Sequence, residues 1–227
     1  MYGDADLDQG SFALKAIWRE AFLFKIPDDL TDEEAAPLMC AGATVWNALR
    51  TYAIAPTATV GVVGVGGLGH LAIQFASKMG MDVVALSGSQ TKREEAMKLG
   101  AHHFYSTNGK KQLDVGEQKL DMLMVTTLHQ PDWDLYLPIL KAEATIFPLT
   151  VAQGNFQMPY MPLILNGIRV QGTVVAPKAV LNSMLQFAAR NQVKPVTMKF
   201  PMTKDGIEEA IRMLEEGQIR YRAVLVS

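Results

Sequence analysis

A cluster of glycines has the residue types and the spacing that bind a phosphate. The apolar stretch Val60–Val63 continues into Gly64, Gly66 and Gly69, which form a G-x-G-x-x-G pattern. The first glycine makes a tight turn, the second lets the backbone approach a pyrophosphate, and the third lets the following helix pack against its strand. The helix N-terminus then offers N–H groups and a partial positive charge to the phosphates. This loop predicts a dinucleotide site made by Gly64, Gly66, Gly67, Leu68 and Gly69.

The flanking residues distinguish this interpretation from a loop in which glycine only supplies a positive φ. Behind the loop, apolar residues recur at helical spacing, and Gly80 is placed to end the helix. Asp82–Ser87 then has the pattern of a second buried strand. Together these segments make a βαβ unit of about thirty residues, the context in which the glycine pattern binds a dinucleotide. The apolar face of the predicted helix consists of Leu68, Leu71, Ala72, Phe75, Ala76 and Met79.

The end of the second strand bears on which dinucleotide is bound. A site for NAD usually places an Asp or Glu there to bind the ribose 2′-hydroxyl. This sequence instead continues from Ser87 through Gly88 to Ser89 and Lys92. Small hydroxyls and a cation suit a 2′-phosphate, so these residues predict NADP. The alternative is a solvated helix start, with Ser and Thr as caps and a lysine on the surface.

Metal-binding chemistry has less support from the spacing of cysteine and histidine. The sequence contains one cysteine, Cys40, and four histidines, with no HxxxH or CxxC pattern. His102 and His103 would point to opposite faces of a strand, which disfavours joint ligation. His70, in the first turn of the predicted helix, is expected to pack rather than to catalyse. Because a catalytic zinc needs three protein ligands, we expect no stably bound catalytic zinc on this chain alone.

The rest of the sequence continues the alternation of strands and helices that positions the loop. Such alternation predicts a doubly wound α/β fold with a parallel sheet. The first fifty residues lack it; they suggest two strands within residues 11–27, then a helix from Asp32 to Tyr52 with Thr31 and Glu34 as a capping box. The remaining predicted strands are 103–106, 120–127, 144–149, 169–175, 196–200 and 221–226, and the remaining helices are 90–99, 132–140, 178–191 and 204–216.

Composition narrows the class of protein. The chain has 227 residues, a net charge of −2 and 49% hydrophobic residues. This charge argues against nucleic acid or an anionic membrane surface as a partner, and there is no apolar run long enough for a transmembrane helix. A single cysteine excludes an internal disulfide framework and fits a reducing, cytoplasmic location. The first residues do not resemble a signal peptide.

Taken together, several segments resemble the zinc-type alcohol dehydrogenases of the medium-chain dehydrogenase/reductase superfamily, in the cinnamyl-alcohol-dehydrogenase-like branch. The resemblance covers essentially the whole chain and implies a Rossmann domain with a six-stranded sheet over residues 51–191. Residues 1–50 and 192–227 would then be remnants of a GroES-like β catalytic domain. The segments are FLFKIPDDL, APLMCAGATVWNAL, VGVVGVGGLGHLAIQFASKMG, SGSQTKREEAMKLGAHHF and IRYRAVLV.

The resemblance also implies roles for single residues. Cys40 matches a catalytic-zinc ligand, and the alternative is a small buried apolar residue. The other cysteines and the His-Glu pair that bind zinc in the family are missing from this sequence, which is therefore expected to be a truncated gene product, an isolated fragment or a degenerate relative. For Thr44 the alternative is a helix hydroxyl bonded to its own backbone, and for Arg220 it is a surface charge. The cofactor contacts that carry over are Thr44, Ser87, Ser89, Lys92, Thr126, Gly172, Thr173 and, at the pyrophosphate, Arg220.

Two classes of function remain open. The first is an NADP(H)-dependent oxidoreductase that interconverts an alcohol and an aldehyde, or a zinc-independent relative that reduces an activated double bond with Tyr52 or His129 as proton donor. The second is a non-catalytic dinucleotide-binding or dimerisation module. The resemblance implies a homodimer formed by sheet edges near Arg169–Val175. Loss of most of a catalytic domain would expose Phe12, Trp18, Phe22 and Phe24 and favour association.

Overall fold

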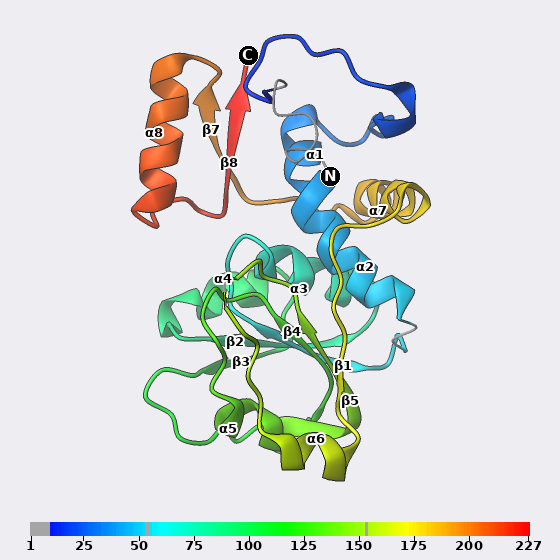
Figure 1. The fold of residues 1–227 in the computed structure, drawn as a ribbon, viewed down its shortest axis with the longest axis vertical. Helices are drawn as coiled ribbons and strands as arrows, with labels where there is room; N and C mark the ends of the chain where they lie inside the picture. The colour runs from blue at the N-terminus through cyan, green and yellow to red at the C-terminus, as the bar shows by residue number, and fades with distance from the viewer. Residues whose placement is uncertain (1–9, 53–54, 153) are drawn as a thin grey trace.

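The larger of two parallel sheets forms the centre of the protein. The computed structural model describes residues 10–52, 55–152 and 154–227, and within them six strands lie in the order β3-β2-β1-β4-β5-β6 (Figure 1). This order, which reverses direction after β1, is that of the doubly wound Rossmann fold, as predicted. The strands are β1 Thr59–Val63, β2 Asp82–Ser87, β3 His103–Ser106, β4 Leu120–Val125, β5 Leu140–Pro148 and β6 Arg169–Val170.

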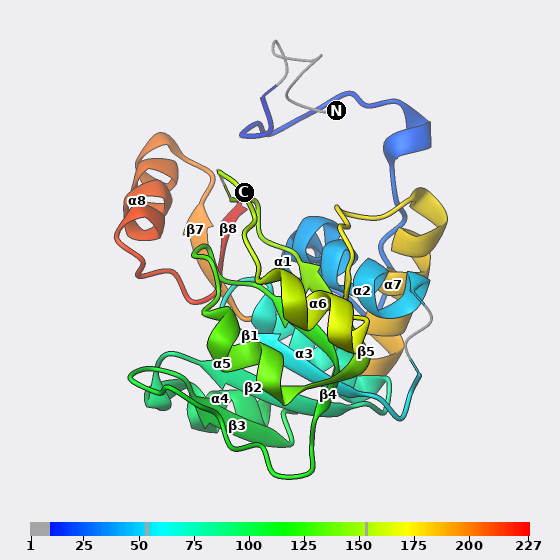
Figure 2. The ribbon, with the colours of Figure 1, turned by 60° about the horizontal axis from the view of Figure 1, so that its bottom comes forward.

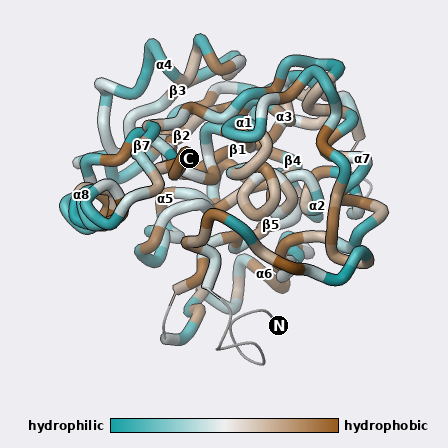
Figure 3. The backbone as a smooth tube through the Cα atoms, turned by 90° about the horizontal axis from the view of Figure 1, so that it is seen from above, coloured by the Kyte–Doolittle hydropathy of each residue, from teal (hydrophilic) through white to brown (hydrophobic). Residues whose placement is uncertain are grey.

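Side chains of β1 alternate between two apolar cores, one on each face of the large sheet. Val60 and Val62 lie in the core beneath α2, α3 and α7, whereas Val63 lies in the core beneath α5. Because both faces are covered, β1 is buried along its whole length, whereas Figure 3 shows the outlying α8 mainly in teal, the hydrophilic colour. The helices around the large sheet are α2 Ala43–Thr51, α3 Gly69–Lys78, α4 Arg93–Lys98, α5 Trp133–Tyr136, α6 Tyr160–Asn166 and α7 Lys178–Asn191.

Helix α3 follows the glycine loop and is buried from Gly69 to Ala76. It therefore packs on all sides rather than on the single face that its apolar spacing suggested. The helix ends where predicted, since Gly80 takes φ +89°, a conformation that glycine adopts without the steric cost of a Cβ.

A small second lobe is made by the end of the chain. Strands β7 (Thr197–Pro201) and β8 (Arg222–Val226) pair in parallel, with α8 (Lys204–Glu215) beside them. Figure 1 places this lobe above the large sheet, with α1 (Asp32–Pro37) next to β8. Ion pairs of 3.1 Å between Lys199 and Glu33 and 2.7 Å between Lys194 and Glu34 tie α1 to this part of the chain.

The predicted helix over residues 32–52 is present but not uniform. Thr31 and Glu34 form the expected capping box, with the Glu34 N–H 3.3 Å from the Thr31 hydroxyl. After α1, a π-helical turn, Leu38–Gly42, precedes α2. Cys40 lies within this turn, and single π-turns inside α-helices are frequent at functional sites.

The two strands predicted within residues 11–27 are absent, and that prediction is wrong. The segment contains one 3-10 turn, Glu20–Phe22, and Figure 2 shows it as an arc that leaves the body of the protein. A strand needs a neighbouring strand to satisfy its backbone groups, and none lies beside this segment in the described part of the chain. Instead Lys178 Nζ donates to the carbonyl of Ala21 at 2.8 Å.

Two further elements are shorter than predicted. The strand expected over 169–175 ends at Val170, because the next residues turn toward α2: Thr173 Oγ1 accepts from Asn47 Nδ2 at 2.7 Å. The helix expected over 132–140 ends at Tyr136 and passes through a 3-10 turn, Leu137–Ile139, that contains a proline. No helix among residues 10–52, 55–152 and 154–227 is both long and apolar enough to cross a membrane.

Candidate functional site

The glycine loop connects the carboxyl end of β1 to α3 in a conformation that depends on glycine. Gly64 has φ +95°, and a Cβ on Gly69 would lie 1.8 Å from the carbonyl oxygen of Gly64. A side chain on Gly66, in contrast, would meet no atom within 4 Å. The loop is thus closed on the protein side at Gly69 and open on its outer side at Gly66, which is the shape that lets a pyrophosphate approach the backbone.

The start of α3 lacks a side-chain cap. Leu68 is its N-cap residue and makes no capping hydrogen bond, so no side chain competes for the first N–H groups of this ten-residue helix. Thr126, which follows β4, donates from Oγ1 to the carbonyls of Val63 and Gly64 at 2.8 and 3.1 Å. In this structure Thr126 therefore holds the loop in place. An anion at the helix N-terminus would meet backbone donors and the helix dipole.

Two side chains help to fix the loop, one from β8 in the C-terminal lobe and one from α3. Arg222, on β8, donates from Nε to the Gly67 carbonyl at 3.1 Å. His70 is fully buried, with Nδ1 2.8 Å from the Gly66 carbonyl and Nε2 3.1 Å from the Val196 N–H. Burial lowers the pKa of His70 to about 4, so the ring is neutral at pH 7 and carries its proton on Nδ1. The sequence predicted His70 as a packing residue, whereas it did not indicate the role of Arg222.

The three residues predicted to bind a 2′-phosphate share one turn at the carboxyl end of β2. Ser87 Oγ accepts from the Ser89 N–H at 3.3 Å, and Ser89 Oγ lies 2.7 Å from the Thr91 hydroxyl. Ser89 caps a 3-10 turn, Gln90–Lys92. Lys92 Nζ donates to the Tyr221 hydroxyl at 3.0 Å and lies over its ring. Both the hydroxyls and the cation needed for a phosphate are therefore adjacent to the glycine loop.

An acidic residue also reaches this turn. Glu95, on α4, accepts from Arg220 Nε at 3.0 Å, accepts from the Tyr221 hydroxyl, and lies 3.9 Å from Lys92 Nζ. Although burial acts to raise it, these hydrogen bonds hold the pKa of Glu95 below its usual value. Arg220 thus lies against α4, whereas the arginine at the glycine loop is Arg222. The sequence did not signal Glu95.

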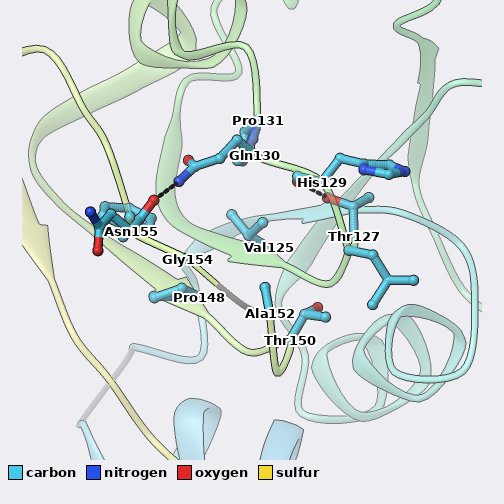
Figure 4. A pocket seen from close by; sticks show the side chains of 12 residues that line it. Val125, Thr127, His129, Gln130, Pro131, Pro148, Thr150, Ala152, Gly154 and Asn155 are labelled. Atoms are coloured by element: carbon cyan, nitrogen blue, oxygen red, sulfur yellow. Dashed lines mark hydrogen bonds between the residues drawn. The ribbon is translucent and has the colours of Figure 1, made fainter.

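A cavity of about 490 Å³ opens at the carboxyl ends of β4 and β5 (Figure 4). Thr127, His129 and Thr150 are among its lining residues. Within the described part of the chain, the Thr150 hydroxyl is a buried group without a hydrogen-bond partner. Buried polar groups normally have partners, so this hydroxyl has unused hydrogen-bonding capacity beside the cavity.

The other predicted contacts lie along α2. Thr44 Oγ1 donates to the Cys40 carbonyl at 2.9 Å, the backbone bond considered as the alternative for this residue. Tyr52 receives a hydrogen bond from Gln171 at 3.2 Å and donates to the Gly172 carbonyl at 3.4 Å. Gly172 and Thr173 therefore anchor the chain after β6 to α2. His129 lines the cavity, and Tyr52 is 36% exposed.

The residues present do not fit a catalytic zinc. Cys40 is exposed, and in the described ranges no three His, Cys, Asp or Glu side chains are grouped so that they could hold a metal ion. His102 and His103 are not directed apart as expected, since a nitrogen of each ring lies 3.4 Å from Asp82 Oδ1. Asp82 begins β2, so this pair lies at the end of the sheet opposite the glycine loop. The backbone at Gly66, in contrast, is open on its outer side, where a pyrophosphate could approach it.

Comparison with known proteins shows that this chain is similar to dehydrogenases and reductases. Residues 67–190 match the model of a family described as zinc-binding dehydrogenase. The chain is 34% identical to an aldehyde reductase of Synechocystis sp. over 95% of this chain and 64% of that protein. It is 32% identical to NADP-dependent alcohol dehydrogenase C 1 of Mycolicibacterium smegmatis over 98% of this chain and 63% of that one.

A solved structure supports the same assignment of fold. The protein superposes on a cinnamyl alcohol dehydrogenase from Sorghum bicolor with a TM-score of 0.84 and 33% identity. The superposition covers 91% of this chain and 58% of that structure. By sequence, the chain spans 63–64% of the length of the aldehyde reductase and of the alcohol dehydrogenase named above.

Proposed function

This chain belongs to the zinc-binding dehydrogenase family, and we propose that it binds NADP(H) as the cofactor-binding part of an oxidoreductase that interconverts an alcohol and an aldehyde. The observation that carries the proposal is the glycine loop between β1 and α3, together with the Ser87–Lys92 turn at the end of the neighbouring strand β2. The loop suits a pyrophosphate and the turn suits a ribose 2′-phosphate.

The strand order supports a path for the cofactor along the carboxyl ends of the strands. Its adenosine half would lie over Ser87, Ser89 and Lys92, its pyrophosphate at Gly66 and the start of α3, and its nicotinamide in the cavity beyond β4 and β5. The Thr150 hydroxyl would give the nicotinamide carboxamide a hydrogen-bond partner. When bound, the cofactor supplies or accepts the hydride. The protein residues hold it in position and supply the electrostatic environment.

The alcohol or aldehyde substrate is proposed from the relatives, whose names state an aldehyde reductase and an alcohol dehydrogenase. The cavity that would hold the nicotinamide would also supply the space for the substrate. No step is assigned to zinc, because Cys40 is the one position here that matches a ligand of the resembled family. His129, in the cavity wall, is the better placed of the two predicted proton donors for a zinc-independent reduction.

A non-catalytic dinucleotide-binding module is the second candidate. It is favoured by one observation: the described residues hold no group of metal ligands, whereas the glycine loop and the Ser87–Lys92 turn are both present. Such a protein would bind NADPH as tightly as an enzyme does and would not turn over. Turnover therefore separates the two candidates, whereas binding does not.

We propose that two copies associate through the β6 edge of the large sheet. Among the described residues β6 pairs with β5 alone and lies at the edge of the sheet, and a free edge strand is a template for pairing. The adjacent α6 exposes Tyr160, Met161, Ile164 and Leu165 at 59–78%, a run of apolar side chains that a second copy would cover. A cytoplasmic location is proposed from the single cysteine.

Binding of NADPH tests the main proposal. The purified chain should enhance NADPH fluorescence with saturable binding, and 2′,5′-ADP should compete. Oxidation of NADPH with a panel of aromatic and aliphatic aldehydes, with and without added Zn²⁺, then tests catalysis. Failure to bind NADPH would overturn the proposed function. Tight binding without turnover under either condition would favour the non-catalytic module.

A further inference from the structure

The turn that faces the proposed 2′-phosphate contains a carboxylate as well as two cations. Glu95 lies on α4 with its side chain 16% exposed, and both Lys92 and Arg220 direct a charged group at it. Tyr221, whose hydroxyl bonds to both Lys92 and Glu95, completes the cluster. Lys92, Glu95, Arg220 and Tyr221 are called the β2-end cluster below.

The negative charge of Glu95 cancels part of the positive charge of the β2-end cluster. One carboxylate and two cations leave a single net positive charge where the 2′-phosphate, a dianion, would bind. Glu95 occupies the donors of Arg220 and Tyr221 and lies 3.9 Å from the ammonium of Lys92. A partly buried charge this close is weakly screened by solvent. Glu95 therefore opposes a phosphate at this position, whereas an uncharged 2′-hydroxyl would not be repelled.

We propose that Glu95 is a specificity-determining residue that limits how strongly the site prefers a 2′-phosphate over a 2′-hydroxyl. This inference rests on the proposed binding of a dinucleotide and goes further by naming the residue that sets the choice. Lys92 and the two serines attract the phosphate; Glu95 weakens that attraction by neutralising the same cations. The wild-type chain accordingly binds NADPH more tightly than NADH, by a margin that Glu95 reduces.

The test measures dissociation constants for NADPH and NADH in Glu95→Gln and wild type. The glutamine amide keeps one oxygen, which can accept from Arg220 as Oε1 of Glu95 does, and its NH2 group can donate to the Tyr221 hydroxyl oxygen, while the negative charge is removed. We expect the ratio of the NADH constant to the NADPH constant to rise about tenfold, with most of the change in NADPH. High salt should reduce the gain.

Glu94→Gln is the matched control, since Glu94 is the preceding residue of α4 and is exposed. It changes the net charge equally, outside the β2-end cluster, and should leave the ratio within about twofold of wild type. A second variant, Arg220→Gln, frees Glu95 from one cation and should lower the ratio. Because Arg220 is 59% exposed, this variant should fold even if Glu95→Gln does not.

The outcomes separate this inference from the proposed function. If the wild-type chain binds neither NADPH nor NADH, the proposed function fails and the inference with it. If wild type binds NADPH but Glu95→Gln changes the ratio no more than Glu94→Gln, or lowers it, the inference is wrong and the proposed function stands. An unchanged ratio in Arg220→Gln would likewise contradict the inference.

Discussion

Arg222 donates a hydrogen bond from Nε to the carbonyl oxygen of Gly67, 155 residues earlier in the chain. The contact joins β8, in the small lobe, to the loop that faces the proposed pyrophosphate. The guanidinium is partly buried, which lowers its pKa from the usual value, yet arginine keeps its charge at neutral pH. The small lobe thus contributes directly to the shape and the electrostatic potential of the proposed cofactor site.

Replacing Arg222 by Met should damage both stability and cofactor binding. The side chain retains its apolar length but loses a charge-assisted hydrogen bond, which contributes about 1.5–3 kcal/mol. We expect the free energy of unfolding in urea to fall by this amount and the affinity for NADPH to weaken as the loop loosens. Arg212→Met is the control: Arg212 forms an exposed pair with Glu216 on α8, and its loss should cost about 0.5 kcal/mol or less.

The glycine loop predicts two different consequences of adding one methyl group. Gly69→Ala would place Cβ 1.8 Å from the Gly64 carbonyl, so the backbone must move, and we expect a loss of stability of about 3 kcal/mol or more. Gly66→Ala meets no protein atom within 4 Å; it should melt like wild type yet bind NADPH poorly, because its methyl occupies the space of the pyrophosphate.

Gly10→Ala is the control for both glycine variants, since a Cβ there also has no neighbour within 4 Å and Gly10 lies outside both the loop and the Ser87–Lys92 turn. It should leave stability and NADPH affinity close to wild type. Normal NADPH binding by Gly66→Ala would contradict the assignment of the loop to the pyrophosphate. Thermal melts monitored by circular dichroism and NADPH titrations give both readouts.

Contacts between distant residues set the limit on what the sequence can predict. The apolar periodicity around Val60–Val63 and α3 depends on residues close together in the chain, so the βαβ unit was predictable. Glu95 and Arg220 are 125 residues apart, and no local pattern reports that they meet. Likewise β6 ends after Val170 because α2 binds the residues that follow, a tertiary contact that overrides the local preference for a strand.

The buried His70 predicts a loss of stability in mild acid. Its pKa is about 4 in the folded protein, chiefly because of burial, and 6.5 is the usual value. The unfolded chain therefore binds more protons between these values, and stability is full above about pH 6.5 and falls as the pH drops toward 4. The expected loss for this residue alone is about 3 kcal/mol.

Urea unfolding measured from pH 7 to pH 4 checks this prediction. His70→Asn should be less stable at pH 7, because both hydrogen bonds are disturbed, and should show a flatter dependence on pH. His129→Asn, which changes a histidine in the wall of the cavity, should keep the slope of wild type. An unchanged slope in His70→Asn would mean that other groups cause the acid sensitivity.

The unpaired Thr150 hydroxyl predicts a variant that separates binding from stability. Thr150→Val has nearly the same shape and removes a buried hydroxyl that has no partner within the described structure. Stability should stay the same or rise slightly, whereas NADPH affinity should fall about threefold to tenfold if the hydroxyl bonds to the nicotinamide. Because 2′,5′-ADP lacks the nicotinamide, its affinity should not change. Equal weakening of both ligands would contradict the proposed placement of the nicotinamide.

A lysine on α6 should separate the proposed dimer. Leu165 is 74% exposed beside the free β6 edge, and Leu165→Lys places a charge where a second copy would bury apolar surface. We expect the mass from light scattering after size exclusion to fall from two chains toward one. Leu214→Lys changes a leucine that is 62% exposed on α8, in the other lobe, and should leave the mass unchanged. A dimer that persists in Leu165→Lys but dissociates in Leu214→Lys would assign the interface to the small lobe instead.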